Sequence, residues 1–162
     1  MALTGHLRKR ISEALLGWSE ADELGDAVDA NTLKSGITST DPASVTITVA
    51  AEDTNVRQIA IAVLDSAGTA VAAICNLDVY VFLDAAGAAL ATTGGSTGIA
   101  LGTGANGILA ATVVAKKVFK CITEPTGVLD LKWTDTGSEA AYLGVALPSG
   151  LITISAAITN AA

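Results

Sequence analysis

Apolar and polar residues alternate with a period of two in most of the chain beyond residue 44. Successive side chains of a β-strand point to opposite faces of a sheet, so this alternation predicts strands with one buried face. Turn signals rich in Gly, Pro and Asp separate the alternating segments. We expect short strands at 45–49, 56–64, 77–83, 99–101, 113–124, 128–134, 140–147 and 151–159.

Three of these segments carry further information. Leu129, Leu131 and Trp133 alternate with charged residues and are expected to point inward. The isoleucines of 151–159 are expected to share one face. Segment 77–83 is apolar on both faces, which indicates a central strand, or a strand whose outer face a neighbouring subunit covers.

One turn motif occurs twice. Residues 64–68, Leu-Asp-Ser-Ala-Gly, are echoed nineteen residues later by residues 83–87, Leu-Asp-Ala-Ala-Gly. Asp at the first position of a turn accepts hydrogen bonds from backbone N–H groups, and Gly at the fourth position supplies a positive φ. The motif therefore predicts a strand, a tight turn and a second strand, in two copies.

The N-terminal residues follow a different period. Leu3, Leu7, Ile11, Leu15 and Trp18 succeed one another at spacings of four, four, four and three, so they form one apolar stripe on a helix. A stripe this hydrophobic does not stay in water, and a helix of this length is marginal alone. We expect it to dock on a partner.

Together these patterns predict three parts: a helical arm at 1–33, a linker rich in Ser, Thr and Gly at 34–44, and a β-domain at 45–162. Short strands separated by turns at this rhythm indicate an all-β antiparallel sandwich, either jelly-roll or immunoglobulin-like. Trp133 follows both cysteines instead of lying between them, which departs from the true immunoglobulin pattern.

The composition indicates burial against other subunits. Charged residues are 15% of the chain and apolar residues 51%, with a mean hydropathy of +0.54. An average soluble domain has about 25% charged residues. A chain with so few charges has trouble covering its own surface, so we expect a homo-oligomer that buries much of it.

The distribution of charge excludes two classes of partner. The net charge is −7 and the one local basic cluster is Arg8–Arg10, which argues against nucleic acid. The uncharged stretch 85–115 is interrupted by Gly and Thr too often for an apolar helix of about 20 residues, so no membrane partner is expected. Glu13 interrupts the apolar region that a signal peptide would need.

The cysteines allow two interpretations. Cys75 and Cys121 either form a disulfide between two strands or are two small buried side chains, and the second is favoured for a chain without an export signal. A metal site needs more ligands than these two cysteines and His6 supply, so no metal is expected.

No group of residues predicts catalysis or a cofactor. Residues 102–107 match G-x-G-x-x-G, with Asp130 as a ribose-binding candidate, but dinucleotide binding needs a helix after the motif, and the following residues are typical of a strand. The one histidine, His6, lies in the N-terminal segment outside the predicted core, and we interpret it as a solvated helix residue and not as a catalytic base. Asp65, Asp84 and Asp135 stand at the starts of turns, which explains them structurally. We predict a protein that is not an enzyme.

About residues 45 to 160 resemble small structural proteins of tailed-bacteriophage virions, especially capsid decoration (cement) proteins and head-fibre proteins. The resemblance rests on Val56–Asp65 with its turn, Val79–Asp84, Thr126–Leu131, Tyr142–Val145 and Pro148–Ile152. It implies a non-enzymatic β-sandwich, commonly a homotrimer, that sits on the outer shell and ties capsomers together. It also implies location in the virion after synthesis in the host cytoplasm, with the major capsid protein or other virion proteins as partners.

The sequence thus leads us to predict a capsid decoration protein, with a head-fibre, tail or baseplate protein as the alternative in the same class. A carbohydrate- or ligand-binding β-module is the alternative from another class, and it would need exposed aromatic residues on one face. The residues predicted to bind the partner are Leu7, Ile11, Leu15 and Trp18 of the arm.

Overall fold

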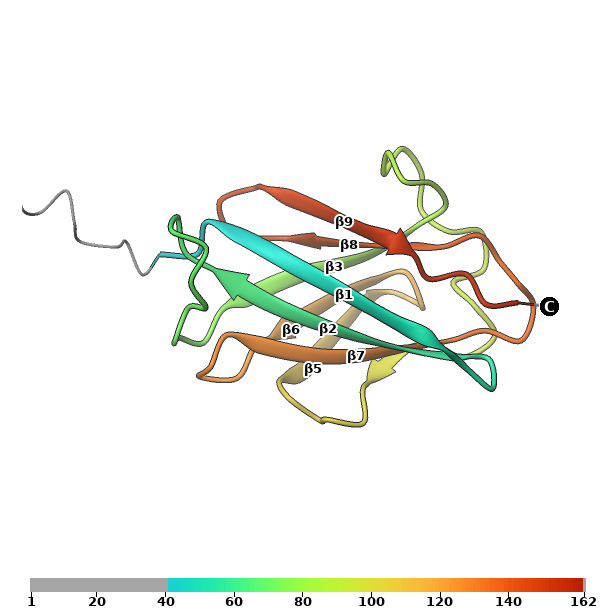
Figure 1. Cartoon of the computed structure of the whole chain (residues 1–162). Helices are drawn as coiled ribbons and strands as arrows, with labels where there is room; N and C mark the ends of the chain where they lie inside the picture. The colour runs from blue at the N-terminus through green and yellow to red at the C-terminus, as the bar shows by residue number, and fades with distance from the viewer. Residues whose placement is uncertain (1–40, 162) are drawn as a thin grey trace, which may run out of the picture. The chain divides into compact units, whose positions relative to one another are not determined.

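A computed structural model describes residues 41–161 of the chain. These residues form nine strands in two antiparallel sheets (Figure 1), which confirms the predicted all-β architecture. No helix occurs within this part of the chain. The predicted helical arm at 1–33 and most of the predicted linker at 34–44 lie outside the described residues.

The first sheet has four strands in the order β1-β2-β7-β4 and lies in front in Figure 1. The second has five strands in the order β5-β6-β3-β8-β9. The bounds of the four-stranded sheet are β1 Ser44–Asp53, β2 Val56–Leu64, β4 Gly98–Leu101 and β7 Val128–Thr134. Those of the five-stranded sheet are β3 Asn76–Phe82, β5 Ile108–Val114, β6 Val118–Ile122, β8 Tyr142–Ala146 and β9 Ile152–Ala157.

The core lies between the two sheets and follows the predicted alternation. The inward residues of β7 are completely buried, as expected, and β3 is the central strand of its sheet. Each sheet contributes β-branched and aliphatic side chains that are at most 1% exposed. The core of the four-stranded sheet includes Ile59, Ile61, Val63, Leu129, Leu131 and Trp133, and that of the five-stranded sheet includes Leu77, Val79, Val81, Cys121, Leu143 and Val145.

The repeated motif forms the same turn twice, as predicted. The carboxylate accepts two backbone N–H groups in each copy, at 2.8 and 2.9 Å for Asp65 and at 2.8 and 3.2 Å for Asp84. Gly68 and Gly87 have φ of +78° and +67°. The predicted second strand is wrong in both copies: only a single bridge follows each turn. The chain then crosses to the opposite sheet, so it cannot extend the pairing.

The predicted single strand at 113–124 is also wrong. The chain turns back between β5 and β6, and Lys116 adopts the left-handed conformation with φ of +63°. Its Nζ donates to the carbonyl oxygens of Gly95 and Ser96 at 3.1 and 2.6 Å. This turn contains no Gly, Asn or Pro, and the contacts that hold it come from a distant loop, so the local sequence gives no sign of it.

The isoleucines of segment 151–159 do not share one face, although the sequence predicts that they do. Ile158 is fully buried, whereas Ile152 is 48% exposed. The pairing of β8 with β9 shifts register between Tyr142 and Gly144. A bulge adds one residue to one strand, which changes the phase of the alternation, so residues on either side of it point to opposite faces.

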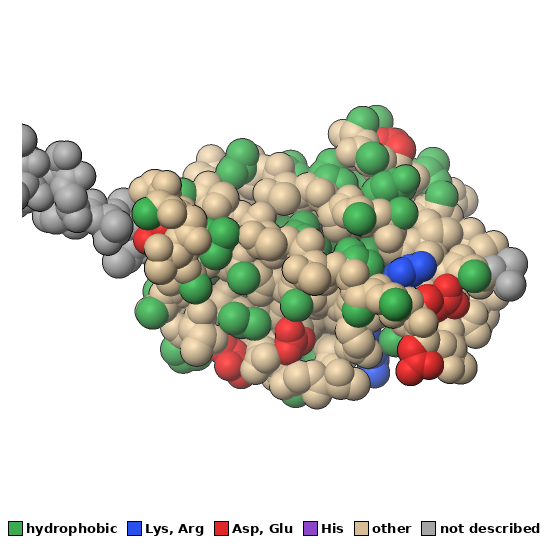
Figure 2. Space-filling model, viewed as in Figure 1, with side chains coloured by type: hydrophobic (Ala, Val, Ile, Leu, Met, Phe, Trp, Pro, Cys, Tyr) green, Lys and Arg blue, Asp and Glu red, His purple; other side chains and the backbone are tan. Residues whose placement is uncertain are grey.

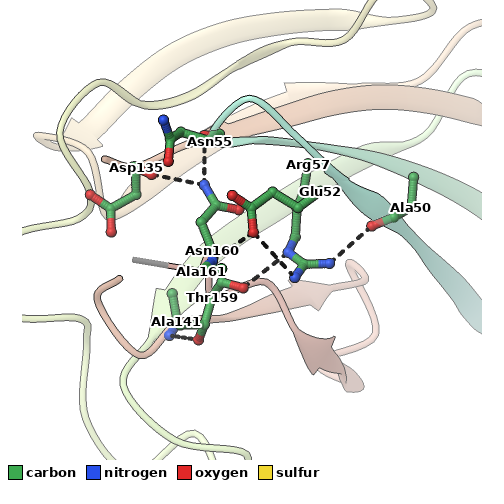
Figure 3. A network of polar contacts seen from close by, with 9 residues as sticks. All are labelled: Ala50, Glu52, Asn55, Arg57, Asp135, Ala141, Thr159, Asn160 and Ala161. Carbon is green, nitrogen blue, oxygen red and sulfur yellow. Dashed lines mark hydrogen bonds and ion pairs between the residues drawn. The ribbon is translucent and has the colours of Figure 1, made fainter. Parts of the chain in front are cut away.

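The last described residues join the two sheets. Arg57 Nε donates to the carbonyl of Thr159 at 3.0 Å, and the amide of Ala161 donates to Glu52 Oε2 at 2.6 Å (Figure 3). The buried side-chain amide of Asn160 donates to the carbonyls of Asn55 and Asp135 at 2.5 and 2.9 Å. This network fastens the end of the chain beside β1, and β1 and β9 lie side by side.

Candidate functional site

The outer surface of the five-stranded sheet is apolar. Residues paired across adjacent strands share a face, and the register places Tyr80 opposite Val118 on one side and Gly144 on the other. Ile154 lies opposite Gly144 in turn. We call the following set the apolar face: Tyr80, Phe82, Val118, Ile122, Tyr142, Gly144, Ala146, Ile152 and Ile154.

Two aromatic rings lie at the centre of the apolar face. The rings of Tyr80 and Phe82 stack with centroids 5.7 Å apart and planes 14° apart. Gly144 makes room for them, because a Cβ there would overlap the ring of Phe82. Gly87 of the second turn lies over Phe82 and Ile154, since a Cβ on it would come within 2.9 Å of Ile154 Cδ1. The turn covers one end of the apolar face and leaves Tyr80 partly exposed.

A single ion pair accompanies the apolar face. Lys120 Nζ lies 2.6 Å from Asp78 Oδ1 and 2.7 Å from Oδ2, with the two side chains 57% and 33% exposed. The hydrogen bond to Asp78 raises the pKa of Lys120. Because the two charges cancel, this side of the described chain offers a neutral surface to a partner.

The outer surface of the four-stranded sheet is more polar. Its outward residues include Thr46, Thr48, Gln58, Asp130 and Lys132. Figure 2, which views this side, shows few charged side chains among many uncharged ones, and hydrophobic side chains gathered at the loop after β3. The two outer surfaces therefore differ in polarity, although neither is highly charged.

The G-x-G-x-x-G loop lies against the four-stranded sheet. Gln58 Oε1 accepts the amide of Thr103 at 3.1 Å, and Asp130 Oδ2 accepts the side-chain amide of Asn106 at 2.6 Å. A shallow hollow of about 180 Å³ lies beside it. The loop leads into strand β5 and not into a helix, so the element that a dinucleotide site requires is missing here. Asp130 fixes the loop.

The turn aspartates have the structural roles predicted for them, and Asp135 organises a larger cluster. Asp135 is 3% exposed and accepts the amides of Ser96, Gly137 and Glu139 at 3.0, 3.2 and 2.8 Å. Glu139 in turn accepts N–H and O–H groups of Thr93 and the amide of Gly95. Burial works to raise the pKa of Glu139, but the hydrogen bonds from Thr93 and Gly95 outweigh it and the pKa is lowered.

Both cysteines are free thiols, buried in the core. Cys121 is 1% exposed, and burial raises the pKa of its thiol to about 12. Burial also raises the pKa of Cys75, against the effect of a hydrogen bond with Thr123. The structure therefore agrees with the interpretation of two small buried side chains.

The residues predicted to bind the partner, Leu7, Ile11, Leu15 and Trp18, lie outside the described residues, as does His6. Lys116 and Lys117 fall in the segment predicted as one strand at 113–124, but they lie at the β5–β6 turn, and their amines donate to backbone carbonyls. Lys120, the third lysine of that segment, lies on β6. Within residues 41–161 no three His, Cys, Asp or Glu side chains are grouped as a metal would need.

Sequence reasoning found part of the apolar face. The two-sided pattern of 77–83 pointed to Tyr80 and Phe82, but Ile152 and Ile154 were expected to share a face with Ile158. The bulge between β8 and β9 decides their orientation, and nothing in the local sequence marks it.

Comparison of the chain with protein-family models, with curated proteins and with solved structures finds no match. Among the described residues there is no helix long and apolar enough to cross a membrane.

Proposed function

We propose that this protein is a structural component of a tailed-bacteriophage particle, a capsid decoration (cement) protein that binds the outer shell and bridges capsomers. In this proposal it acts as a homotrimer and carries no catalytic site. The observation that carries the proposal is the apolar face, a broad neutral surface on an otherwise well-packed sandwich. The sequence resemblance to phage structural proteins supplies the biological setting.

The apolar face runs across four adjacent strands of its sheet, and Ile152 at its edge is 48% exposed. Contiguous apolar patches on monomers rarely exceed a few hundred Å², about 300–600 Å² for the largest. The apolar face crosses β6, β3, β8 and β9 and has one internally neutralised ion pair. Obligate interfaces commonly bury over about 2,000 Å² and are more apolar than transient ones. A face of this kind is suited to permanent contact with another subunit.

The arm supplies a second, separate contact in this proposal. Its predicted stripe of Leu7, Ile11, Leu15 and Trp18 would dock on a subunit of the shell, with Arg8–Arg10 facing acidic groups of that partner. Deleting residues 1–33 should leave a folded oligomer that no longer binds particles. Full occupancy of particles by the truncated protein would show that the arm is not the anchor.

A matched pair of lysine substitutions tests the role of the apolar face. Ile152→Lys places a charge on a 48% exposed position of that face, and Thr46→Lys places the same charge on an exposed position of the opposite sheet. Light scattering would measure the oligomer mass, and electron microscopy the occupancy on particles that lack the native protein. We expect Ile152→Lys to lose the trimer or the decoration, and Thr46→Lys to retain both. Retention of both by Ile152→Lys would contradict the proposal.

Head-fibre, tail and baseplate proteins are the alternatives within the same class, and the position of the protein on the particle distinguishes them. A carbohydrate-binding β-module is favoured by one observation: Tyr80, Phe82 and Tyr142 lie on the same face. Phe82 is only 9% exposed, but the rings of Tyr80 and Tyr142 are partly exposed, and such rings can stack on sugars. A clear hit on a glycan array that Tyr80→Ala abolishes would favour this alternative over a structural role.

A further inference from the structure

The loop between β4 and β5 contains the dipeptide Asn106–Gly107. An asparagine followed by glycine is the pair most prone to deamidation, because glycine has no Cβ to keep its backbone nitrogen away from the asparagine side chain. Asn55, Asn76 and Asn160 are followed by Val, Leu and Ala, whose side chains hinder that approach. Both residues of the dipeptide are half-buried, so water can reach them.

Deamidation at such a dipeptide needs no enzyme. The backbone nitrogen of Gly107 loses its proton and attacks the side-chain carbon Cγ of Asn106, and the bond between Cγ and Nδ2 breaks. The lost proton and the Nδ2 group leave together as ammonia, and the chain keeps a five-membered succinimide ring. Water then opens the ring at either carbonyl, which gives aspartate or isoaspartate without any oxidant or reductant.

Asp130 of β7 holds both of the reacting groups. Its carboxylate oxygen Oδ2 accepts the side-chain amide of Asn106 at 2.6 Å. Its backbone N–H donates at 2.9 Å to the carbonyl of Asn106, which belongs to the same peptide unit as the nitrogen of Gly107. The side chain must rotate towards Gly107 to be attacked, and that rotation breaks the hydrogen bond to the carboxylate. The docked loop is therefore protected from deamidation.

The rest of the loop fits closely around the same aspartate. The N–H of Gly102 donates to the carbonyl of Asp130 at 2.9 Å. Gly104 leaves room for the carboxylate, because a Cβ there would overlap Oδ2. Gln58 of β2 adds one more bond, since its Oε1 accepts the amide of Thr103 at 3.1 Å. The site is thus built for a carboxylate that faces a hydrogen-bond donor.

We propose that Asn106 is a covalent modification site, at which deamidation is held back by Asp130 and, once it occurs, releases the G-x-G-x-x-G loop irreversibly. Aspartate at this position puts a carboxylate where the amide donated, so two like charges would meet without a proton between them. Isoaspartate routes the backbone through the former side chain and lengthens it by one carbon next to Gly107. The backbone there has little room, because a Cβ on Gly107 would lie 2.6 Å from the carbonyl oxygen of Ile122.

Incubation of the full chain at mildly alkaline pH, followed by peptide mass spectrometry, tests the protection. Asp130→Ala removes the carboxylate, whereas Asp130→Asn keeps an oxygen that still accepts the side-chain amide. We expect Asp130→Ala to deamidate at Asn106 at least about tenfold faster than the wild type, and Asp130→Asn to stay within about threefold of it. Asn76 is the control within the same chain, and its rate should not change.

A synthetic peptide of residues 102–110 gives the rate without the fold, and we expect it to exceed that of the intact protein at least about tenfold. This comparison also decides the question if Asp130→Ala loses the wild-type circular dichroism. Equal rates in the peptide and the protein would overturn the protection. So would a folded Asp130→Ala that reacts like the wild type, or an Asp130→Asn that reacts as fast as Asp130→Ala.

Amide hydrogen exchange of the loop tests the release. Asn106→Asp is the aspartate product made directly, and Asn106→Ala loses the same hydrogen bond without adding a charge. We expect the amides of Gly102 and Thr103 to exchange faster in Asn106→Asp than in Asn106→Ala, and slowest in the wild type. Exchange in Asn106→Asp that is no faster than in Asn106→Ala would overturn the release by like charges. Neither measurement uses a phage particle, so both outcomes are independent of the proposed function.

Discussion

The two copies of the turn motif allow one prediction to be tested within a single chain. Asp65 and Asp84 occupy the same place in the same turn, and each accepts two backbone N–H groups through one oxygen. They differ in burial, because Asp65 is 6% exposed whereas Asp84 lies in a more open turn. Replacing each by Ala removes the same bonds from different surroundings.

The expected costs follow from that difference. A hydrogen bond to a charged group contributes about 1.5–3 kcal/mol, and less where water can replace the lost acceptor. For Asp65→Ala we expect a loss of about 2–4 kcal/mol, because the buried carboxylate cannot be replaced fully by water. For Asp84→Ala, with bonds of 2.8 and 3.2 Å in an exposed turn, we expect about 1 kcal/mol or less.

Urea unfolding followed by circular dichroism, at one protein concentration, measures both losses. Asp65→Asn serves as the control, since its amide oxygen still accepts both N–H groups, and it should recover more than half of the stability lost in Asp65→Ala. Equal losses for the two alanine variants, or a larger loss for Asp84→Ala, would refute the argument from burial.

Three further predictions concern the two cysteines, two glycines and Glu139. Replacing Cys75 and Cys121 together by Ala should leave assembly intact and cost a few kcal/mol at most, as for small buried side chains, and unfolding by a reducing agent alone would contradict this. Gly95→Ala should lower the free energy of unfolding, measured by heat or urea, by about 2–4 kcal/mol, because φ is +75° and a Cβ would lie 2.7 Å from the buried indole of Trp133. Gly68→Ala has open space around the new Cβ and should lower it by about 1 kcal/mol. The lowered pKa of Glu139 means that its stabilisation is present above the pKa of the unfolded chain and is lost as the pH falls through the folded value. Glu139→Gln should therefore flatten the pH dependence of stability on the acid side, and an unchanged acid slope would count against the hydrogen bonds described.

Much of the sandwich was predictable from the sequence because its strongest signals are local. β2 and β7 begin and end at the predicted residues, 56–64 and 128–134, since clean alternation lies between clear turn residues. The turn at Asp65 and its copy at Asp84 formed as expected, because Asp and Gly fix such a turn without help from the rest of the chain.

The predicted strand at 113–124 and the predicted face of the isoleucines are wrong because contacts with distant residues decide the local structure there. The turn at Lys116 is held by carbonyl groups of the loop at 95–96, and a lysine in the left-handed conformation has no sequence signal. The bulge in the β8–β9 pairing turned Ile152 away from the core. Likewise, the pairing of β3 with β8 places the ring of Phe82 over Gly144, where no side chain obstructs it. That pairing joins segments far apart in the sequence. The sequence alone therefore could not predict which residues form the apolar face, because strand pairing between distant segments brings them together.

A density map of the parent phage particle by cryo-electron microscopy tests the central claim most directly. We predict three copies of the sandwich around three-fold positions on the outer shell, with the apolar face covered by a neighbouring subunit. A map in which the sandwich is absent from the particle, or in which Tyr80 and Ile152 face bulk solvent, would contradict the account.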